Sequence, residues 1–250
     1  MQPLCDASED DFALLESLFT ENALNVAPRS VADFALASFW RDRYSAEAVS
    51  KPSIEWYAVT LHAVLEAAGL LITKAAVVVQ LGCGNSSWGS KLSANGFTVL
   101  DSDVDAELLS RLRKQRREVT NRTCNARLTP RQSFAALDAT SLAVRKGCAD
   151  IVLEKGVFDA LSPGEGGAAR VRTAVANALN CLQPGGSLLC VTTQAGRLLA
   201  LLGPLENSGQ PDRSGQRSQL VAFQDIAGYT CGRPRMFISG RFLVTFVNQF

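Results

Sequence analysis

The chain has 250 residues, of which 47% are hydrophobic and 20% are charged, and its formal net charge is +1. This length suits one large α/β domain better than two small ones, and the apolar content is enough for a sizeable core. A net charge so close to zero gives no overall field that would attract nucleic acid or an anionic membrane surface. No apolar run approaches the roughly 18 residues of a membrane helix. We therefore expect neither a membrane partner nor a nucleic-acid substrate.

Cysteine and histidine usage bounds the chemistry further. Seven cysteines are scattered without a Cys-x-x-Cys pair, and the amino-terminal segment is acidic, which is the wrong sign for a signal or transit peptide. These features predict reduced thiols and a cytoplasmic location. His62 is the only histidine, which excludes a multi-histidine metal site. We expect no metal and assign His62 to packing or to the surface, with a catalytic base as the alternative.

The first expected element is an amphipathic helix within residues 1–30, whose apolar residues have helical spacing. We interpret it as an additional packing helix, and the alternative is a cover over a ligand. Residues 1–38 are therefore assigned to an N-terminal helical extension and residues 39–250 to the main domain. A second apolar helix is expected over residues 57–71.

From residue 77 onward, apolar strand patterns alternate with helical patterns. The expected strands are Val77–Leu81, Phe97–Leu100, Phe134–Leu137, Ile151–Glu154 and Ser187–Val191. The expected helices are Ser87–Asn95, Asp105–Arg117, Ala168–Leu182 and Gln194–Leu202, with a turn at residues 184–186. Such alternation is typical of an α/β fold with a mostly parallel, doubly wound, Rossmann-like sheet. Two last strands, Gln219–Phe223 and Arg241–Val247, are expected to add a C-terminal antiparallel hairpin.

A Gly-x-Gly turn follows the first of these strands, and an acid follows the second. Gly82 and Gly84 allow a tight turn and a close backbone approach to a ligand, and the next helix offers free N–H groups at its start. Asp103 lies 19 positions after Gly84, near the roughly 20 expected for an acid that binds ribose hydroxyls. The order strand, glycine turn, helix, strand, acid predicts a nucleotide-type ligand.

Residues 111–131 form the one local basic patch of the chain. They contain eight basic residues and a single acid, Glu118. A solvated helix face and loop is the favoured interpretation, and a contact to an acidic protein or to RNA is the alternative.

Several motifs together resemble a known family. They are Phe39–Tyr44, Glu55–Tyr57, Leu81–Ser86, Leu137–Thr140 and Val152–Leu161, the last containing the specific Glu-Lys-Gly-x-x-Asp-Ala element. In this order they resemble the seven-strand, class I S-adenosylmethionine-dependent protein lysine methyltransferases. The resemblance is greatest to the methyltransferase-like group that modifies translation elongation factor one alpha or citrate synthase. It implies S-adenosylmethionine as cofactor and a lysine side chain of a protein as acceptor.

The resemblance assigns residues to the methionine end of the donor. It implies that Gly82, Gly84 and Asn85 line this end. Arg43 and Tyr44 would reach the methionine carboxylate, where a guanidinium offers a charge-assisted hydrogen bond.

Further residues are implied for the nucleoside end. Asp103 would bind the ribose hydroxyls, with Asp101 as the alternative. Asp138 and Ala139 would contact the adenine, through a carboxylate and a backbone N–H respectively. Trp56 would close the methionine end of the site.

The acceptor side is expected at the end of the strand that contains Glu154. We expect Glu154 to be catalytic by orienting the incoming amine, because open α/β sheets bind ligands at the carboxyl ends of their strands. The residues expected to contact the substrate are Tyr57, Phe158 and Asp159, with Trp56 as a further channel residue. The alternatives are a structural ion pair for Glu154 and a helix-capping role for Asp159.

Three other functions remain open on the sequence. The same fold serves small-molecule and RNA methyltransferases, which fold class does not exclude. An NAD-dependent dehydrogenase is disfavoured because Ser87 stands where the dinucleotide fingerprint has its third glycine. An inactive, cofactor-binding partner protein is the third alternative. The sequence also departs from the family at Val157, where members usually carry threonine.

Overall fold

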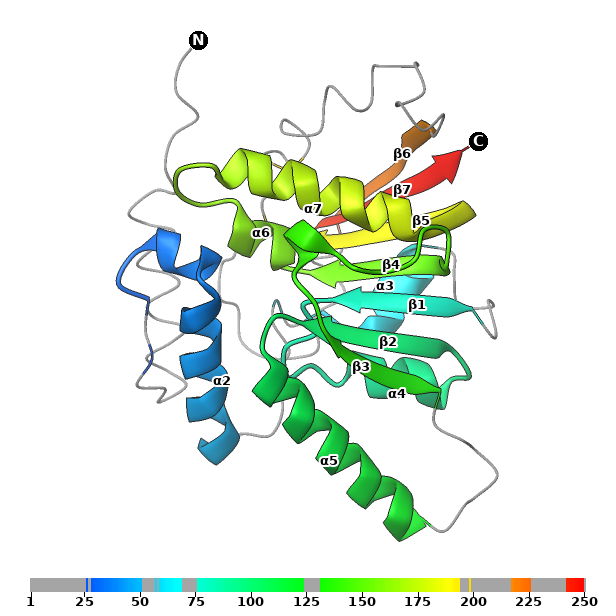
Figure 1. The fold of residues 1–250 in the computed structure, drawn as a ribbon. Helices are drawn as coiled ribbons and strands as arrows, with labels where there is room; N and C mark the ends of the chain where they lie inside the picture. Colours follow the sequence, from blue (N-terminus) through cyan, green and yellow to red (C-terminus); the bar gives the residue numbers. More distant parts are fainter. Residues whose placement is uncertain are drawn as a thin grey trace.

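The computed structural model describes residues 26, 28–50, 57, 59–68, 76–123, 131–193, 198, 217–225 and 242–249. Within these ranges the chain forms one sheet with helices on both of its faces (Figure 1). The helix expected within residues 1–30, the helix expected at 194–202 and Trp56 lie almost wholly outside the described residues. The division of the chain at residue 38 stays a prediction.

Seven strands make up the sheet. They are β1 (Val77–Leu81), β2 (Thr98–Asp103), β3 (Gln132–Ala136), β4 (Ala149–Lys155), β5 (Leu182–Thr192), β6 (Arg217–Asp225) and β7 (Phe242–Gln249). Their order across the sheet is β3-β2-β1-β4-β5-β7-β6. Strands β1 to β5 are parallel to one another, whereas β7 is antiparallel to both β5 and β6. The predicted α/β fold with a mostly parallel sheet is confirmed.

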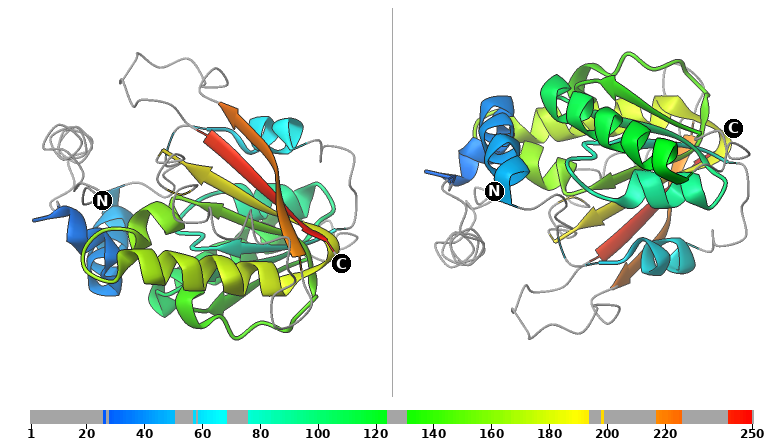
Figure 2. Two further views of the ribbon diagram at one scale, coloured as in Figure 1. Left: turned by 90° about the horizontal axis from the view of Figure 1, so that it is seen from above. Right: turned by 90° about the horizontal axis from the view of Figure 1, so that it is seen from below.

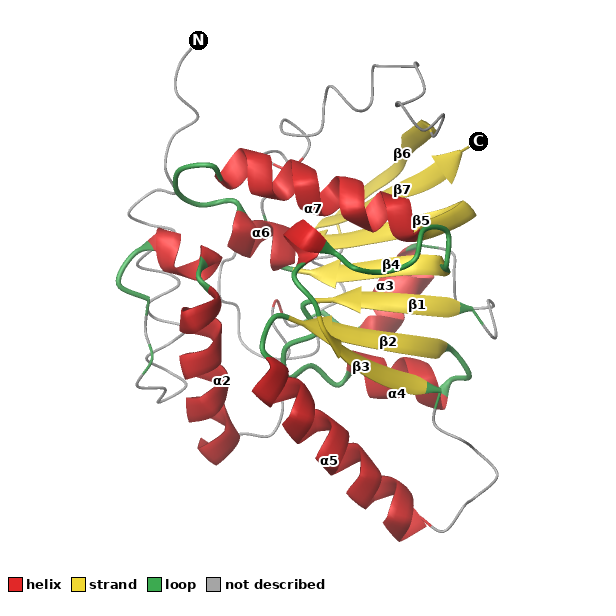
Figure 3. Cartoon of the chain, viewed as in Figure 1, coloured by secondary structure: helices red, strands yellow, loops and turns green. Residues whose placement is uncertain are grey.

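The helical elements are distributed along the whole chain (Figure 3). They are η1 (Val31–Ala35), α2 (Ala37–Ser50), α3 (Leu61–Ala67), α4 (Trp88–Ala94), α5 (Ala106–Thr123), η3 (Ala139–Ser141), α6 (Val157–Leu161) and α7 (Gly167–Cys181). Figure 2 shows α7 on one face of the sheet and α3 on the other.

Two apolar clusters fill the layers between the sheet and its helices. On one face Leu81 and Val152 pack with Val171 and Val175 of α7. On the other face β-strand residues such as Leu153 pack with residues of α3 and α4. Because the central strands are covered on both faces, their sequences read as continuous apolar runs rather than as alternating patterns. This explains why short Val- and Leu-rich runs located the strands correctly.

The structure shortens the helix expected at residues 57–71. Helix α3 starts only after Thr60, whose side chain accepts a hydrogen bond from the backbone N–H of Ala63 at 3.1 Å. Tyr57 has a φ of 67°, a left-handed conformation that cannot continue into a right-handed helix. The turn expected at residues 184–186 is a bulge within β5, where Ala149 pairs with Leu182 but Ile151 pairs with Ser187.

Much of the basic segment 111–131 has structural partners. Arg111 donates to the carbonyl of Tyr44 at 3.2 Å, and Arg113 donates to the carbonyl of Phe134 at 3.0 Å. Arg116 donates to the hydroxyl of Ser93 at 3.1 Å. These contacts support the interpretation of this segment as a packed and solvated helix.

Candidate active site

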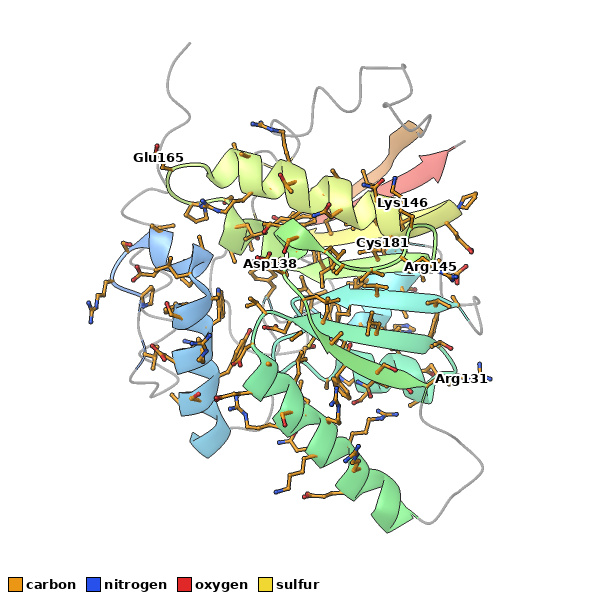
Figure 4. All side chains as sticks on the ribbon, viewed as in Figure 1. Arg131, Asp138, Arg145, Lys146, Glu165 and Cys181 are labelled. Carbon is orange, nitrogen blue, oxygen red and sulfur yellow. The ribbon has the colours of Figure 1, made fainter. Side chains whose placement is uncertain are left out.

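The site lies where the parallel strands end. In Figure 1 the carboxyl ends of β1 and β4 point toward α2. The strand order reverses between these two strands, and open α/β sheets bind ligands at such a switch point. Figure 4 shows Asp138 on this side of β3 and Arg131 at the opposite end of the strand. The exposed basic residues Arg131, Arg145 and Lys146 therefore lie at the edge away from the site.

The turn after β1 requires glycine at two positions. Gly82 has a φ of 53° and Gly84 a φ of 52°, which other residues rarely adopt. A Cβ on Gly82 would overlap the Cγ2 atom of Val157, and a Cβ on Gly84 would lie 2.7 Å from the hydroxyl of Tyr44. The turn is thus a bare backbone surface bordered by one side chain from α6 and one from α2.

Asp103 joins this turn to the end of β2. Its Oδ2 accepts a hydrogen bond from the backbone N–H of Gly84 at 2.9 Å, and its Oδ1 accepts one from the N–H of Asp105 at 3.0 Å. Burial raises the pKa of this carboxyl group, and the two amide hydrogen bonds oppose that rise. A carboxylate can accept about four hydrogen bonds, so capacity for two ribose hydroxyls remains.

Asp101, the alternative for this role, has a different environment. Its carboxyl group packs directly against Gly89 of α4 and accepts a hydrogen bond from Gln132. Burial raises its pKa from 3.8 to about 6. Because Asp101 is covered by a helix whereas Asp103 touches the glycine turn, the geometry favours Asp103 for ribose binding.

Asp138 follows β3 and is solvent-exposed. Its Oδ1 accepts hydrogen bonds from the backbone N–H and the hydroxyl of Thr140, both at 2.7 Å. Its Oδ2 accepts none from the described residues, which leaves an oxygen for an exocyclic amine. The carbonyl of Ala139 accepts a hydrogen bond from Asn177 of α7 at 3.0 Å, which fixes this segment to the core.

Helix α2 supplies the expected residues Arg43 and Tyr44, and both are buried. The ring of Tyr44 stacks on Trp40 with centroids 5.8 Å apart. Asn85, in the turn after β1, is also buried. The structure therefore brings the described donor-side candidates to one edge of the sheet.

Glu154 occupies a different position from the one its expected role requires. Its side chain is fully buried, and its Oε2 accepts hydrogen bonds from the backbone N–H groups of Val157 at 2.9 Å and Phe158 at 3.3 Å. Burial and the nearby Asp159 raise its pKa well above the ordinary value. Glu154 thus holds the start of α6, and in this geometry it presents no oxygen to an incoming amine.

Phe158 also departs from its expected place. It is 1% exposed and belongs to the apolar cluster between α7 and the sheet. A side chain in that layer stabilises the core and does not line an open channel. The prediction of Phe158 as a substrate contact is corrected by this burial.

Asp159 receives hydrogen bonds from two distant segments. The hydroxyl of Tyr57 donates to its Oδ2 at 2.8 Å, and the backbone N–H of Thr193 donates to the same oxygen at 3.0 Å. The hydroxyl of Thr192 donates to its Oδ1. The sequence analysis missed both threonines, although their place at the carboxyl end of β5 was a usable signal. Tyr57 and Asp159 are brought together as expected, but they bind each other.

Two further classes of site were searched for in the described part of the chain. No group of three or more His, Cys, Asp and Glu side chains there could hold a metal ion. None of its helices combines the length and apolar character needed to cross a bilayer.

Comparison with known proteins agrees with this geometry. Residues 79–190, which contain the glycine turn, Asp103 and Glu154, match the model of a methyltransferase domain. The chain is similar to the human eEF1A lysine and N-terminal methyltransferase, with 28% identity over 182 residues. That match covers 70% of this chain but 24% of the human protein. The chain thus spans about a quarter of the length of the relatives it matches.

Solved structures share the fold at low sequence identity. A TehB-like SAM-dependent methyltransferase from Corynebacterium glutamicum superimposes with a TM-score of 0.54 and 15% identity, covering 85% of this chain and 97% of that chain. The N-methyltransferase NodS from Bradyrhizobium japonicum, in complex with S-adenosyl-L-homocysteine, gives a TM-score of 0.51 and 16% identity. It covers 86% of this chain and 94% of its own.

Proposed function

Because this chain carries a class I methyltransferase domain, we propose that it transfers methyl groups from S-adenosylmethionine to a lysine side chain of a protein. The observation that carries the proposal is the 2.9 Å hydrogen bond between the N–H of Gly84 and the carboxylate of Asp103. It joins a bare glycine turn to a buried acid at the switch point of the sheet. Such a pair suits a ligand that has both a ribose and an amino-acid tail.

The residues present fit this cofactor. Gly82 and Gly84 leave space that no Cβ fills, so the methionine end would lie against backbone. Asp103 would hold the ribose hydroxyls, and the open oxygen of Asp138 would accept the adenine amine. Arg43, buried in α2, would face the methionine carboxylate.

The chain's part in the chemistry is to position and desolvate the reactants. S-adenosylmethionine, when bound, supplies an electrophilic methyl group on a sulfonium. A lysine amine has an ordinary pKa near 10.4, so it has to reach the donor in its neutral form. The turn after β4, including Gly156 and Val157, borders Gly82 and is where we place the amine. Holding the two reactants in line supplies a large share of such an acceleration.

The relatives suggest the acceptor. Their names state that they modify lysine and the N-terminus of eEF1A. We propose an eEF1A-like translation elongation factor as the substrate of this chain, and hence an encounter in the cytoplasm. The Glu-Lys-Gly-x-x-Asp-Ala element, residues 154–160, supports this choice over other methyltransferase classes.

Two measurements test the proposal. Calorimetry should show binding of S-adenosylmethionine and S-adenosyl-L-homocysteine, and no comparable binding of NAD. A preference for NAD would contradict the methyltransferase assignment. Incubation with tritiated donor should then label purified eEF1A, and mass spectrometry should locate the label on lysine. Label that enters only RNA or small metabolites in a lysate would reject a protein acceptor.

A further inference from the structure

Tyr57 is held in a conformation that its surroundings must maintain. With a φ of 67°, it is the only non-glycine residue of positive φ among those described. A conformation of this kind costs of order 1–3 kcal/mol and persists only where neighbouring groups determine it. The 2.8 Å hydrogen bond from its hydroxyl to Asp159 is such a contact.

The ring of Tyr57 lies directly on the turn after β4. A Cβ on Gly156 would come within 2.7 Å of the Tyr57 hydroxyl and 3.1 Å of its ring carbons. Gly156 has a φ of 80° and precedes Val157, whose Cγ2 fills the space beside Gly82. The phenol is therefore one residue away from the glycine turn on which the donor would lie.

Asp159 has its own hydrogen-bonding capacity occupied by the protein. The Tyr57 hydroxyl and the Thr193 N–H share one oxygen, and the Thr192 hydroxyl takes the other. An oxygen pair so occupied cannot also bind a lysine ammonium without releasing a partner. Asp159 therefore has a mechanical link to the site, through the phenol that it holds.

Building on the proposed function, we infer that Asp159 is a positioning residue that acts through Tyr57. By fixing the phenol over Gly156, it sets how closely an acceptor amine can approach and turn at the donor's methyl group. This role affects acceptor KM and the number of methyl groups added. It does not affect donor binding, because Asp103 and Asp138 lie at the ends of other strands.

The test compares three variants of the full chain. Asp159→Asn keeps the shape but loses acceptor capacity, and Tyr57→Phe removes only the hydroxyl. Asp150→Asn is the matched control: Asp150 accepts hydrogen bonds from the N–H of Val77 and from Gln183, at the amino end of the same strand, β4. The chain has three tyrosines, so 3-fluorotyrosine labelling gives a ¹⁹F spectrum in which loss of one signal in Tyr57→Phe assigns Tyr57.

We expect Asp159→Asn to shift the Tyr57 resonance and Asp150→Asn to leave it in place. With eEF1A as acceptor, Asp159→Asn and Tyr57→Phe should each raise KM about tenfold, equivalent to about 1.4 kcal/mol, and change the ratio of mono-, di- and trimethylated product. The double variant should be no worse than either single one, because both remove one interaction. The Kd for S-adenosyl-L-homocysteine should stay within about twofold.

Two results would overturn the inference. One is an unchanged Tyr57 resonance in Asp159→Asn. The other is a shifted resonance with the KM and product ratio of Asp150→Asn. If the wild-type chain transfers no label to eEF1A, the proposed acceptor fails instead, and the ¹⁹F signal still decides whether Asp159 positions Tyr57.

Discussion

The two halves of the candidate site differ in how they use their polar groups. At the ends of β1, β2 and β3, Asp103 and Asp138 keep acceptor capacity beyond their bonds to the protein. At the end of β4, Glu154 and Asp159 direct theirs to backbone amides, a tyrosine and threonines. Acidic residues on the donor half are therefore open to a ligand, whereas those on the acceptor half build the wall around one. The same residue type does different work at neighbouring strand ends.

The strongest test of this difference is the loss of Asp103. Asp103→Ala should weaken binding of S-adenosyl-L-homocysteine by about 100-fold, because hydrogen bonds to a charged group contribute about 1.5–3 kcal/mol each. Calorimetry measures the change. Asp150→Asn serves as the folded control, and Asp103→Asn should give an intermediate loss if the alanine variant is unstable. Unchanged affinity in both Asp103 variants would remove Asp103 from the donor site.

The buried Asp101 should make stability depend on pH. Its folded pKa of about 6 lies above the ordinary 3.8, so the folded state retains a proton that the unfolded state has lost. Stability is therefore fully present below about pH 4 and falls as the pH rises through about 6, by about 3 kcal/mol. Asp101→Asn should lack this decrease. Urea titrations at pH 4.5 and 7.5 measure it, and equal slopes in both proteins would contradict the prediction.

Gly156 should tolerate alanine less well than a glycine of similar conformation. Gly156→Ala introduces a Cβ 2.7 Å from the Tyr57 hydroxyl at a φ of 80°, whereas Gly185 has a φ of 74° and no atom within 4 Å of an added Cβ. We expect Gly185→Ala to cost about 1 kcal/mol from backbone strain and Gly156→Ala about 2 kcal/mol more from crowding. Thermal unfolding compares them. Equal losses would show that Tyr57 does not pack on Gly156.

Replacing Glu154 should have the smallest effect. A glutamine can still accept hydrogen bonds from the N–H groups of Val157 and Phe158, and the raised pKa of Glu154 means that little charge is lost. Glu154→Gln should bind donor normally and keep kcat within about threefold. A loss of 100-fold or more with intact donor binding would restore the catalytic role expected from the sequence.

The donor half could be predicted from the sequence because its signals are local. The apolar run of β1, the glycines after it and the acid at the end of β2 each follow from short patterns, and β1 has the predicted bounds. The acceptor half could not, since the hydrogen bond from Tyr57 to Asp159 spans 102 positions. No short pattern reveals a contact at that separation. The burial of Glu154 and Phe158 was missed for a related reason, because the turn that covers them is defined by tertiary packing.

One feature of the fold links the two halves. Tyr44 touches the glycine turn after β1 and Tyr57 touches the glycine after β4, so a single stretch of chain borders both reactants. Anything that settles the first contact lowers the entropy left to lose at the second. Methyl donor and protein would then associate in a preferred sequence, donor first, and departure of the spent nucleoside would loosen the enzyme's hold on its modified target.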